Sequence, residues 1–148
     1  NQTSVAEFNI WEDPEAARVV LASGVDTVAV GLDVTADVAA CMAPPHLERL
    51  RAGQTRAAQL AARVARYAIA RYGCCELHDP LALAVLLDAT LFELVPAQIE
   101  VVAGDGPDRG RTRIAAPETV GEAARTRVAA AVDGPRFLEL FVSRLLEA

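Results

Sequence analysis

A carboxylate and an amide lie close together near the start of the chain, inside the apolar run "VAEFNIW". If residues 4 to 11 form a short strand or extended loop, side chains alternate between faces, and Glu7 and Asn9 share one face. A carboxylate in an apolar setting is costly unless a polar group meets it. Glu7 and Asn9 could together exchange hydrogen bonds with a polyhydroxylated ligand. The alternative is a solvated edge strand that binds no ligand.

A histidine and an aspartate form a second candidate pair in "LHDPLALAVLLD". Asp79 before Pro80 is typical of a helix start, because a carboxylate caps free backbone amides and proline fits the first turn. Asp79 could therefore be only a cap, and His78 only a loop residue. In the functional interpretation, Asp79 offers an oxygen ligand to Ca²⁺. His78 would exchange a proton or a hydrogen bond with a substrate, as histidine side chains commonly do.

Three cysteines, Cys41, Cys74 and Cys75, are an odd number with an adjacent pair, which is not the pattern of a disulfide framework. Such usage is typical of a reduced, cytoplasmic protein. Cys74, Cys75 and His78 could also contribute to a zinc site, although a second ligand pair at zinc-finger spacing is missing. We therefore expect free thiols and a cytoplasmic location.

Composition and charge narrow the class of protein. The 148 residues are 53% hydrophobic and 23% charged, which predicts one globular domain over residues 1–148. A net charge of −6 argues against nucleic acid or an anionic membrane as the main partner. The longest aliphatic run, residues 81–87, is far too short to span a bilayer. The chain starts at Asn1 without Met and without a recognisable signal peptide, and we expect further polypeptide upstream.

Helix and strand patterns alternate along the chain. Capping residues and helical spacing predict helices over residues 14–24, 46–53, 55–72 and 78–92, and a last helix that begins at Pro135. In the helix over 55–72, Leu60, Val64 and Tyr67 recur at helical spacing. Alternating or bounded apolar runs predict strands over residues 26–35, 97–105 and 126–133, with a hairpin through 106–114. This order predicts an α/β sandwich with a largely parallel sheet, in which ligands bind at the carboxyl ends of strands.

Several stretches together resemble the inosine-uridine-preferring nucleoside hydrolase family. They are "NQTSVAEFNIWEDPEAA", "VGLDVT", "LHDPLALAVLLD", "IEVVAGDGPDRGRT" and "VDGPRFLELF", which follow the family's order and cover nearly the whole chain. The resemblance implies a three-layer α/β sandwich with a mostly parallel mixed sheet. It also implies a role in purine or pyrimidine nucleoside catabolism, through Ca²⁺-dependent hydrolysis of the N-glycosidic bond to ribose and a free base.

The resemblance also implies roles for single residues. Asn1, Glu7 and Asn9 match residues that hold the ribose. Asp79 matches a Ca²⁺ ligand that also touches a ribose hydroxyl, and His78 matches the histidine that faces the base and helps to protonate it. Tyr72 falls near a helix end that supplies an aromatic residue to the base in relatives, although the loop from Tyr72 to His78 is short.

One part of the family pattern is missing. The amino-terminal aspartate cluster D-x-D-x-x-x-D-D, which supplies most Ca²⁺ ligands and the general base in relatives, has no match here. The chain therefore looks like the carboxyl-terminal half of a nucleoside hydrolase, which needs the amino-terminal half or a partner chain. By the same resemblance we expect a homo-oligomer. The alternative is a non-catalytic binding or assembly module that kept the fold without the reaction.

Overall fold

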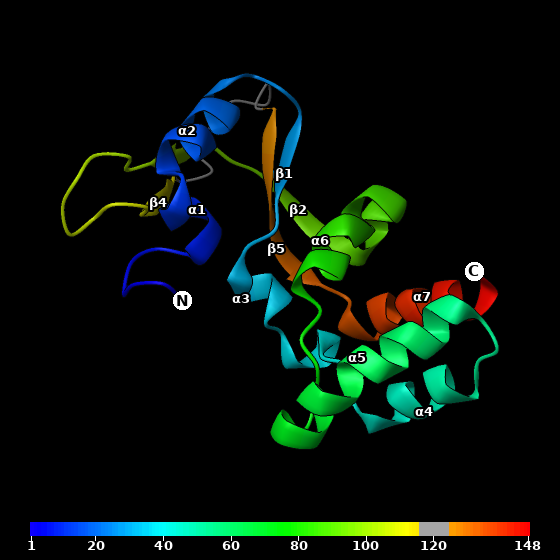
Figure 1. Cartoon of the computed structure of the whole chain (residues 1–148). Helices are drawn as coiled ribbons and strands as arrows, with labels where there is room; N and C mark the ends of the chain where they lie inside the picture. The colour runs from blue at the N-terminus through cyan, green and yellow to red at the C-terminus, as the bar shows by residue number, and fades with distance from the viewer. Residues whose placement is uncertain (116–124) are drawn as a thin grey trace. The chain divides into compact units, whose positions relative to one another are not determined.

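The computed structural model describes residues 1–115 and 125–148 and shows an α/β chain (Figure 1). The residues cluster into two compact units. The first unit consists of Asn1–Ala29 and Leu94–Ala129, and the second of Val30–Glu93 and Ala130–Ala148. None of the helices in the described residues is long and apolar enough to cross a membrane.

The first unit contains two short helices, α1 (Phe8–Glu12) and α2 (Pro14–Ala22), and a hairpin of β3 (Ile99–Val101) and β4 (Thr112–Ile114). The predicted cap of α2 is confirmed, because the Ala16 amide donates to Asp13 Oδ1 at 2.8 Å. The predicted hairpin is also confirmed, with antiparallel strands. Gly110 lies between these elements at φ 77°, and a Cβ there would come within 2.9 Å of Trp11 Cα. This position therefore needs glycine.

A three-stranded sheet has the order β1 (Thr27–Ala29), β5 (Thr126–Val132) and β2 (Phe92–Pro96). β1 and β5 are parallel, with Val28 opposite Arg127. The strand predicted over 126–133 is thus confirmed. β2 was not predicted, because its first residue ends an apolar run that we assigned to a helix.

The second unit is mainly helical. It contains α3 (Leu32–Thr35), η1 (Val38–Ala40), α4 (Pro44–Ala52), α5 (Arg56–Tyr72), α6 (His78–Leu87), η2 (Ala89–Leu91) and α7 (Gly134–Glu147). α4, α5 and α7 pack against one another. Leu50 on α4 and Phe137 and Val142 on α7 are almost completely buried. Gly134 begins α7 directly against η1, where a Cβ would lie 2.4 Å from the carbonyl carbon of Ala39.

The buried face of α5 is not the face that carries Leu60, Val64 and Tyr67. Leu60, Val64 and Tyr67 are between 61% and 71% exposed. The buried positions are Ala58, Ala62, Ala65 and Ile69. Small side chains on this face allow the neighbouring helices to come close, so alanine rather than leucine marks the packed side.

Two sequence-based predictions of strand are wrong. Residues 4 to 11 do not form one extended segment, because α1 begins at Phe8. The predicted strand over 26–35 ends at Ala29, and Leu32–Thr35 form α3. In α3 the amides of Val34 and Thr35 donate to the carbonyl of Gly31 at 3.1 and 3.0 Å. Both regions contain apolar residues at alternate positions, but local capping bonds turn the backbone into a helix.

Candidate functional site

Asn1, Glu7 and Asn9 gather at the amino terminus of α1. Glu7 caps this helix, because its Oε2 accepts from the backbone amides of Asn9 and Ile10 at 2.9 and 3.3 Å. The side-chain amide of Asn9 donates to Glu7 Oε1 at 3.1 Å. Asn1 Oδ1 accepts from the amide of Phe8 at 3.0 Å. The structure thus brings together three predicted ribose-binding residues, by a helix cap rather than by alternation along a strand.

The amino-terminal polar group (Asn1, Glu7 and Asn9) is oriented and accessible. Glu7 is half-buried, whereas Asn1 and Asn9 are exposed. The backbone amides hold the Glu7 carboxylate in one direction, and its charge is favourable at the positive end of a helix. A carboxylate has about four acceptor positions, so Glu7 can still accept a hydrogen bond from a hydroxyl group. The group is therefore suited to a ligand with several hydroxyls.

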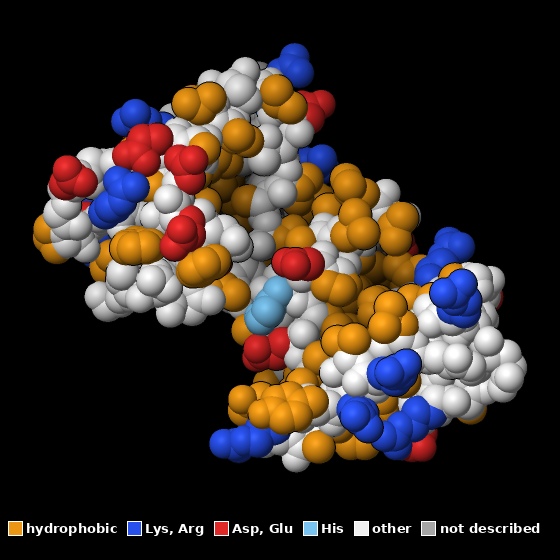
Figure 2. Space-filling view, viewed as in Figure 1, with side chains coloured by type: hydrophobic (Ala, Val, Ile, Leu, Met, Phe, Trp, Pro, Cys, Tyr) orange, Lys and Arg blue, Asp and Glu red, His pale blue; other side chains and the backbone are white. Residues whose placement is uncertain are grey.

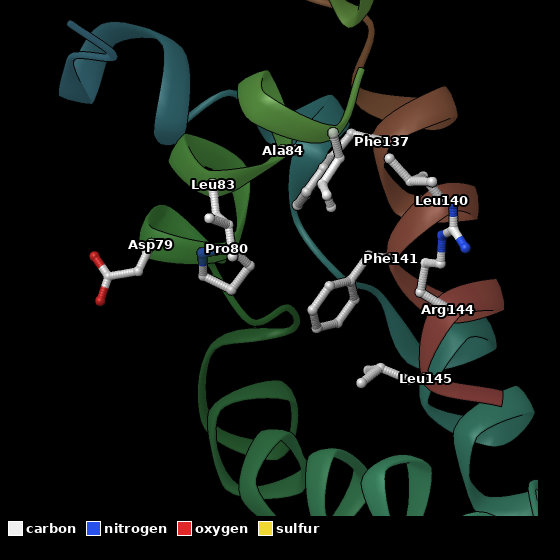
Figure 3. A pocket seen from close by; sticks show the side chains of 10 residues that line it. Asp79, Pro80, Leu83, Ala84, Phe137, Leu140, Phe141, Arg144 and Leu145 are labelled. Atoms are coloured by element: carbon white, nitrogen blue, oxygen red, sulfur yellow. The ribbon is translucent and has the colours of Figure 1, made fainter. Parts of the chain in front are cut away.

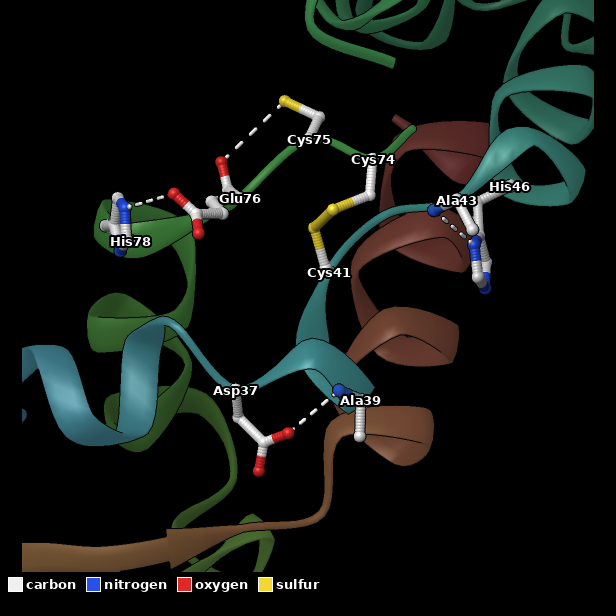
Figure 4. Close-up of a disulfide and its surroundings, with 9 residues drawn as sticks. All are labelled: Asp37, Ala39, Cys41, Ala43, His46, Cys74, Cys75, Glu76 and His78. Atoms are coloured by element: carbon white, nitrogen blue, oxygen red, sulfur yellow. Dashed lines mark hydrogen bonds and ion pairs between the residues drawn. A yellow bond between two sulfur atoms is a disulfide. The ribbon is translucent and has the colours of Figure 1, made fainter. Parts of the chain in front are cut away.

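His78 is held from both sides of its ring. Nδ1 lies 2.9 Å from the hydroxyl of Thr35. Nε2 lies 3.2 Å from a carboxylate oxygen of Glu76, the contact drawn in Figure 4. A carboxylate only accepts, so Nε2 donates to Glu76, and in the neutral ring Nδ1 accepts from Thr35. Thr35 is buried, with 6% exposed. Sequence reasoning did not single out Thr35 or Glu76, although Thr35 ends the "VGLDVT" motif.

Asp79 is exposed in the first turn of α6, one residue after the first residue of that helix. The proposed role as a helix cap is wrong, because Leu77 is the N-cap and makes no side-chain cap bond. Within the described residues the Asp79 carboxylate has no ion pair or hydrogen bond to a side chain. In Figure 3 it points away from the apolar residues behind it. Its oxygens are therefore available to an external ligand.

No cluster of three or more potential metal ligands (His, Cys, Asp or Glu) occurs in the part of the chain that the structure describes. Ca²⁺ requires six to eight oxygen ligands in general. Asp79 fits as one such ligand, because its carboxylate is exposed and unpaired within the described residues. The remaining oxygens would have to come from other polypeptide, substrate or water.

Tyr72 is the last residue of α5 and is 70% exposed. Gly73 ends the helix in the left-handed conformation, with φ 86°. The guanidinium carbon of Arg71 lies 5.2 Å from the centre of the Tyr72 ring. This cation–π contact occupies one face of the ring. The other face is open to a ligand, as a base-stacking role would require.

The cysteines differ from the prediction of free thiols. Cys41 and Cys74 form a disulfide, and Cys75 is free (Figure 4). Met42 and Cys75 exchange two backbone hydrogen bonds of 3.0 and 2.9 Å, which bring their chain neighbours Cys41 and Cys74 side by side. With Cys74 in a disulfide, a zinc site on Cys74, Cys75 and His78 is excluded. Burial, and then the charge of Glu76, raise the pKa of the Cys75 thiol, so it is a poor nucleophile near neutral pH.

The candidate residues therefore form two groups. Asn1, Glu7 and Asn9 meet in the first unit, at the start of α1. His78 and Asp79 begin α6 in the second unit, where Tyr72 ends α5. Each group lies at a helix terminus, and the side chains of each are exposed or half-buried.

A family model described as "Inosine-uridine preferring nucleoside hydrolase" matches residues 1–139. The chain therefore belongs to the inosine-uridine preferring nucleoside hydrolase family. It is 32% identical over 143 residues to the pyrimidine-specific ribonucleoside hydrolase RihB of Escherichia coli O157:H7, and the match covers 93% of this chain and 45% of that protein.

Solved structures of nucleoside hydrolases have the same fold. The purine-preferring ribonucleoside hydrolase from Gardnerella vaginalis matches with a TM-score of 0.83 and 34% identity, over 97% of this chain and 46% of that one. The plant nucleoside hydrolase PpNRh1 matches with a TM-score of 0.83 and 25% identity, over 100% of this chain and 50% of that one. The predicted α/β nucleoside hydrolase fold is thus confirmed. The chain spans about half the length of these relatives.

Proposed function

We propose that the chain supplies part of the site of a ribonucleoside hydrolase, which cleaves the N-glycosidic bond to give ribose and a free base. Family membership supports the reaction class. The observation that carries the proposal is the amino-terminal polar group, in which a helix cap holds Asn1, Glu7 and Asn9 together. Such an arrangement of acceptors and donors fits the hydroxyl groups of a pentose.

The ribose would be held by the amino-terminal polar group. When the glycosidic bond breaks, the sugar ring develops the positive charge of an oxocarbenium ion. The Glu7 carboxylate is already oriented by two backbone amides, so it can stabilise this charge without reorganisation. Hydrogen bonds to several hydroxyls would also fix the position of the reacting carbon.

His78 would face the base and give it a proton as it leaves. The contacts with Thr35 and Glu76 fix the plane of the ring. The donor would be the imidazolium form, which would pass its Nε2 proton to the base in place of Glu76 and return to the neutral ring. A base that departs with a proton is a better leaving group than an anion, and general acid catalysis of this kind contributes typically 10²–10⁴-fold in rate. The exposed face of Tyr72 would stack against the base.

Asp79 would be one oxygen ligand of Ca²⁺ and a partner of a ribose hydroxyl. Bound Ca²⁺ would supply a water of lowered pKa and an anchor for the sugar. The proposal requires that the other half of the nucleoside hydrolase fold supplies the missing oxygen ligands and the general base.

That the chain forms a homo-oligomer and that it lies in the cytoplasm stay predictions. The Cys41–Cys74 disulfide weighs against a cytoplasmic location, because cytosolic thiols are usually kept reduced.

The alternative function, a non-catalytic binding or assembly module, is favoured by one observation. The described residues contain no cluster of metal ligands.

Replacement of Asp79 in a fusion protein tests the proposal. The fusion protein consists of these 148 residues joined to the half of the G. vaginalis hydrolase that the chain does not match. We expect release of base from inosine or uridine to depend on calcium, and Asp79→Ala to abolish nearly all of it. Ala replacement of an exposed carboxylate that caps no helix should cost less than about 0.5 kcal/mol of stability. A fully active Asp79→Ala variant would contradict the assignment, and a folded but inactive parent would favour the non-catalytic module.

A further inference from the structure

Helix α6 is apolar on all sides, yet the described residues cover only one side of it. Leu81, Ala84 and Val85 are buried on the packed side. On the opposite side Leu83, Leu86 and Leu87 are 58%, 79% and 63% exposed. Figure 2 shows hydrophobic side chains gathered over this helix. A helix that is hydrophobic all round is normally buried within a larger protein.

A groove runs beside the exposed leucines, between α6 and α7. Its volume is about 370 Å³, and Leu83, Leu87, Leu140 and Phe141 contribute to an almost wholly apolar lining (Figure 3). The groove and the three leucines together form what we call the α6 surface. A continuous apolar surface of this kind marks an interaction site.

We propose that the α6 surface is where the other half of the nucleoside hydrolase fold packs. The relatives are about twice as long as this chain, so their shared fold contains a second half of similar size. In that half, an apolar helix or sheet face would cover Leu83, Leu86 and Leu87. Removal of apolar side chains from water is favourable, so the three exposed leucines would make this surface a strong anchor.

The position of Asp79 supports this occupant over a second copy of the chain. Asp79 lies in the first turn of α6 and at the rim of the same groove. If Asp79 is a Ca²⁺ ligand, which rests on the proposed function, its other ligands must come from polypeptide that packs next to this helix. A second copy would present the same apolar surface, and no metal-ligand cluster from its described residues.

Thiol labelling measures the coverage directly. We expect Leu86→Cys to react quickly with a maleimide in the isolated chain, and about tenfold or more slowly in the fusion protein, where labelling would require local opening. Val19→Cys is the matched control, because Val19 is 67% exposed on α2 and lies outside the groove. It should react equally in both proteins. Peptide mass spectrometry separates these labels from any on Cys75.

A second measurement uses the isolated chain only. Leu86→Glu should leave its melting temperature unchanged and reduce its binding of the apolar dye ANS, because Leu86 has no covering layer there. Equal labelling of Leu86→Cys in both proteins would overturn the proposal, even if the fusion protein hydrolyses inosine. A dimer of the isolated chain that Leu86→Glu dissociates would also overturn it, because a second copy would then cover this surface. A much lower melting temperature of Leu86→Glu would show that Leu86 is already packed in the isolated chain, and this result would also overturn the proposal.

Discussion

The imidazole of His78 shows how much of a functional residue depends on neighbours that are remote in sequence. Glu76 is two residues away, but Thr35 lies 43 positions earlier and is buried at the end of α3. Because one neighbour is a carboxylate and the other a hydroxyl, the ring can take only one neutral tautomer. The side chain that would protonate the base is therefore oriented before any substrate arrives.

Replacement of Thr35 tests this orientation. Thr35→Val keeps the shape but removes the hydroxyl, and should cost about 1 kcal/mol of stability for the lost hydrogen bond. In the fusion protein we expect kcat for inosine to fall with little change in KM, because the effect lies on proton transfer rather than binding. Thr35→Ser, which retains the hydroxyl, is the matched control and should recover most of kcat. An equal loss for a substrate whose leaving group needs no proton would contradict this role.

At the scale of helices and strands, one exposed ion pair joins α4 to α7. The guanidinium of Arg49 donates to both carboxylate oxygens of Glu139 at 2.6 and 2.8 Å, and Ser143 donates a third hydrogen bond at 2.9 Å. These contacts lower the pKa of Glu139 from 4.5 to about 2. The carboxylate is thus ionised in the folded chain at pH values where it would be protonated in the unfolded chain.

The pKa of Glu139 predicts an acid-dependent loss of stability. A carboxyl group with a lowered pKa contributes its full stabilisation above its ordinary pKa, and loses it as the pH falls towards the lowered value. We expect the melting temperature of the parent to fall between pH 4.5 and about 2 more steeply than that of Glu139→Gln. High salt should reduce the difference, because exposed ion pairs are screened. Identical profiles for the two proteins would show that the pair contributes nothing.

The Cys41–Cys74 disulfide joins the segment before α4 to the loop that leads to His78. It closes a loop with a sequence separation of 33 residues. A loop of this length predicts roughly 3–4 kcal/mol of stabilisation through restriction of the unfolded chain. Cys74→Ser should therefore lower the free energy of unfolding in urea by about that amount. Cys75→Ser is the control and should change little, and equal stability of all three proteins would exclude a structural disulfide.

At the scale of the whole molecule, the chain carries the proposed ribose-binding group and one proposed metal ligand, but no metal-ligand cluster in the described residues. We therefore predict that the isolated chain binds calcium weakly and does not hydrolyse nucleosides. Titration calorimetry with calcium chloride and assay of base release from inosine and uridine measure the two properties. Calcium-dependent turnover by the isolated chain would refute the prediction.

Much of the fold could be predicted from local signals. Asp13 and Pro14 mark the start of α2, and Gly53 and Gly73 directly follow α4 and α5. These signals act within one helical turn, so the sequence contains them complete. The strand predictions failed at α1 and α3, where an alternating apolar pattern competes with the side-chain cap of Glu7 and with backbone bonds to the Gly31 carbonyl. An alternating apolar pattern alone does not show whether the strand or the helix is the more stable conformation.

The candidate site, like the fold, was predictable from the sequence only in part. The sequence by itself determined the family, because ordered motifs such as "AEFN" and "HDP" survive without coordinates, and it identified the residues that could bind ribose and calcium. Only the tertiary structure decided that Thr35 supports His78, that Cys41 pairs with Cys74, and that the leucines of α6 stay uncovered. Each of these depends on which segments distant along the chain lie against one another. Packing of the whole chain sets such proximity, and no local pattern of residues encodes it.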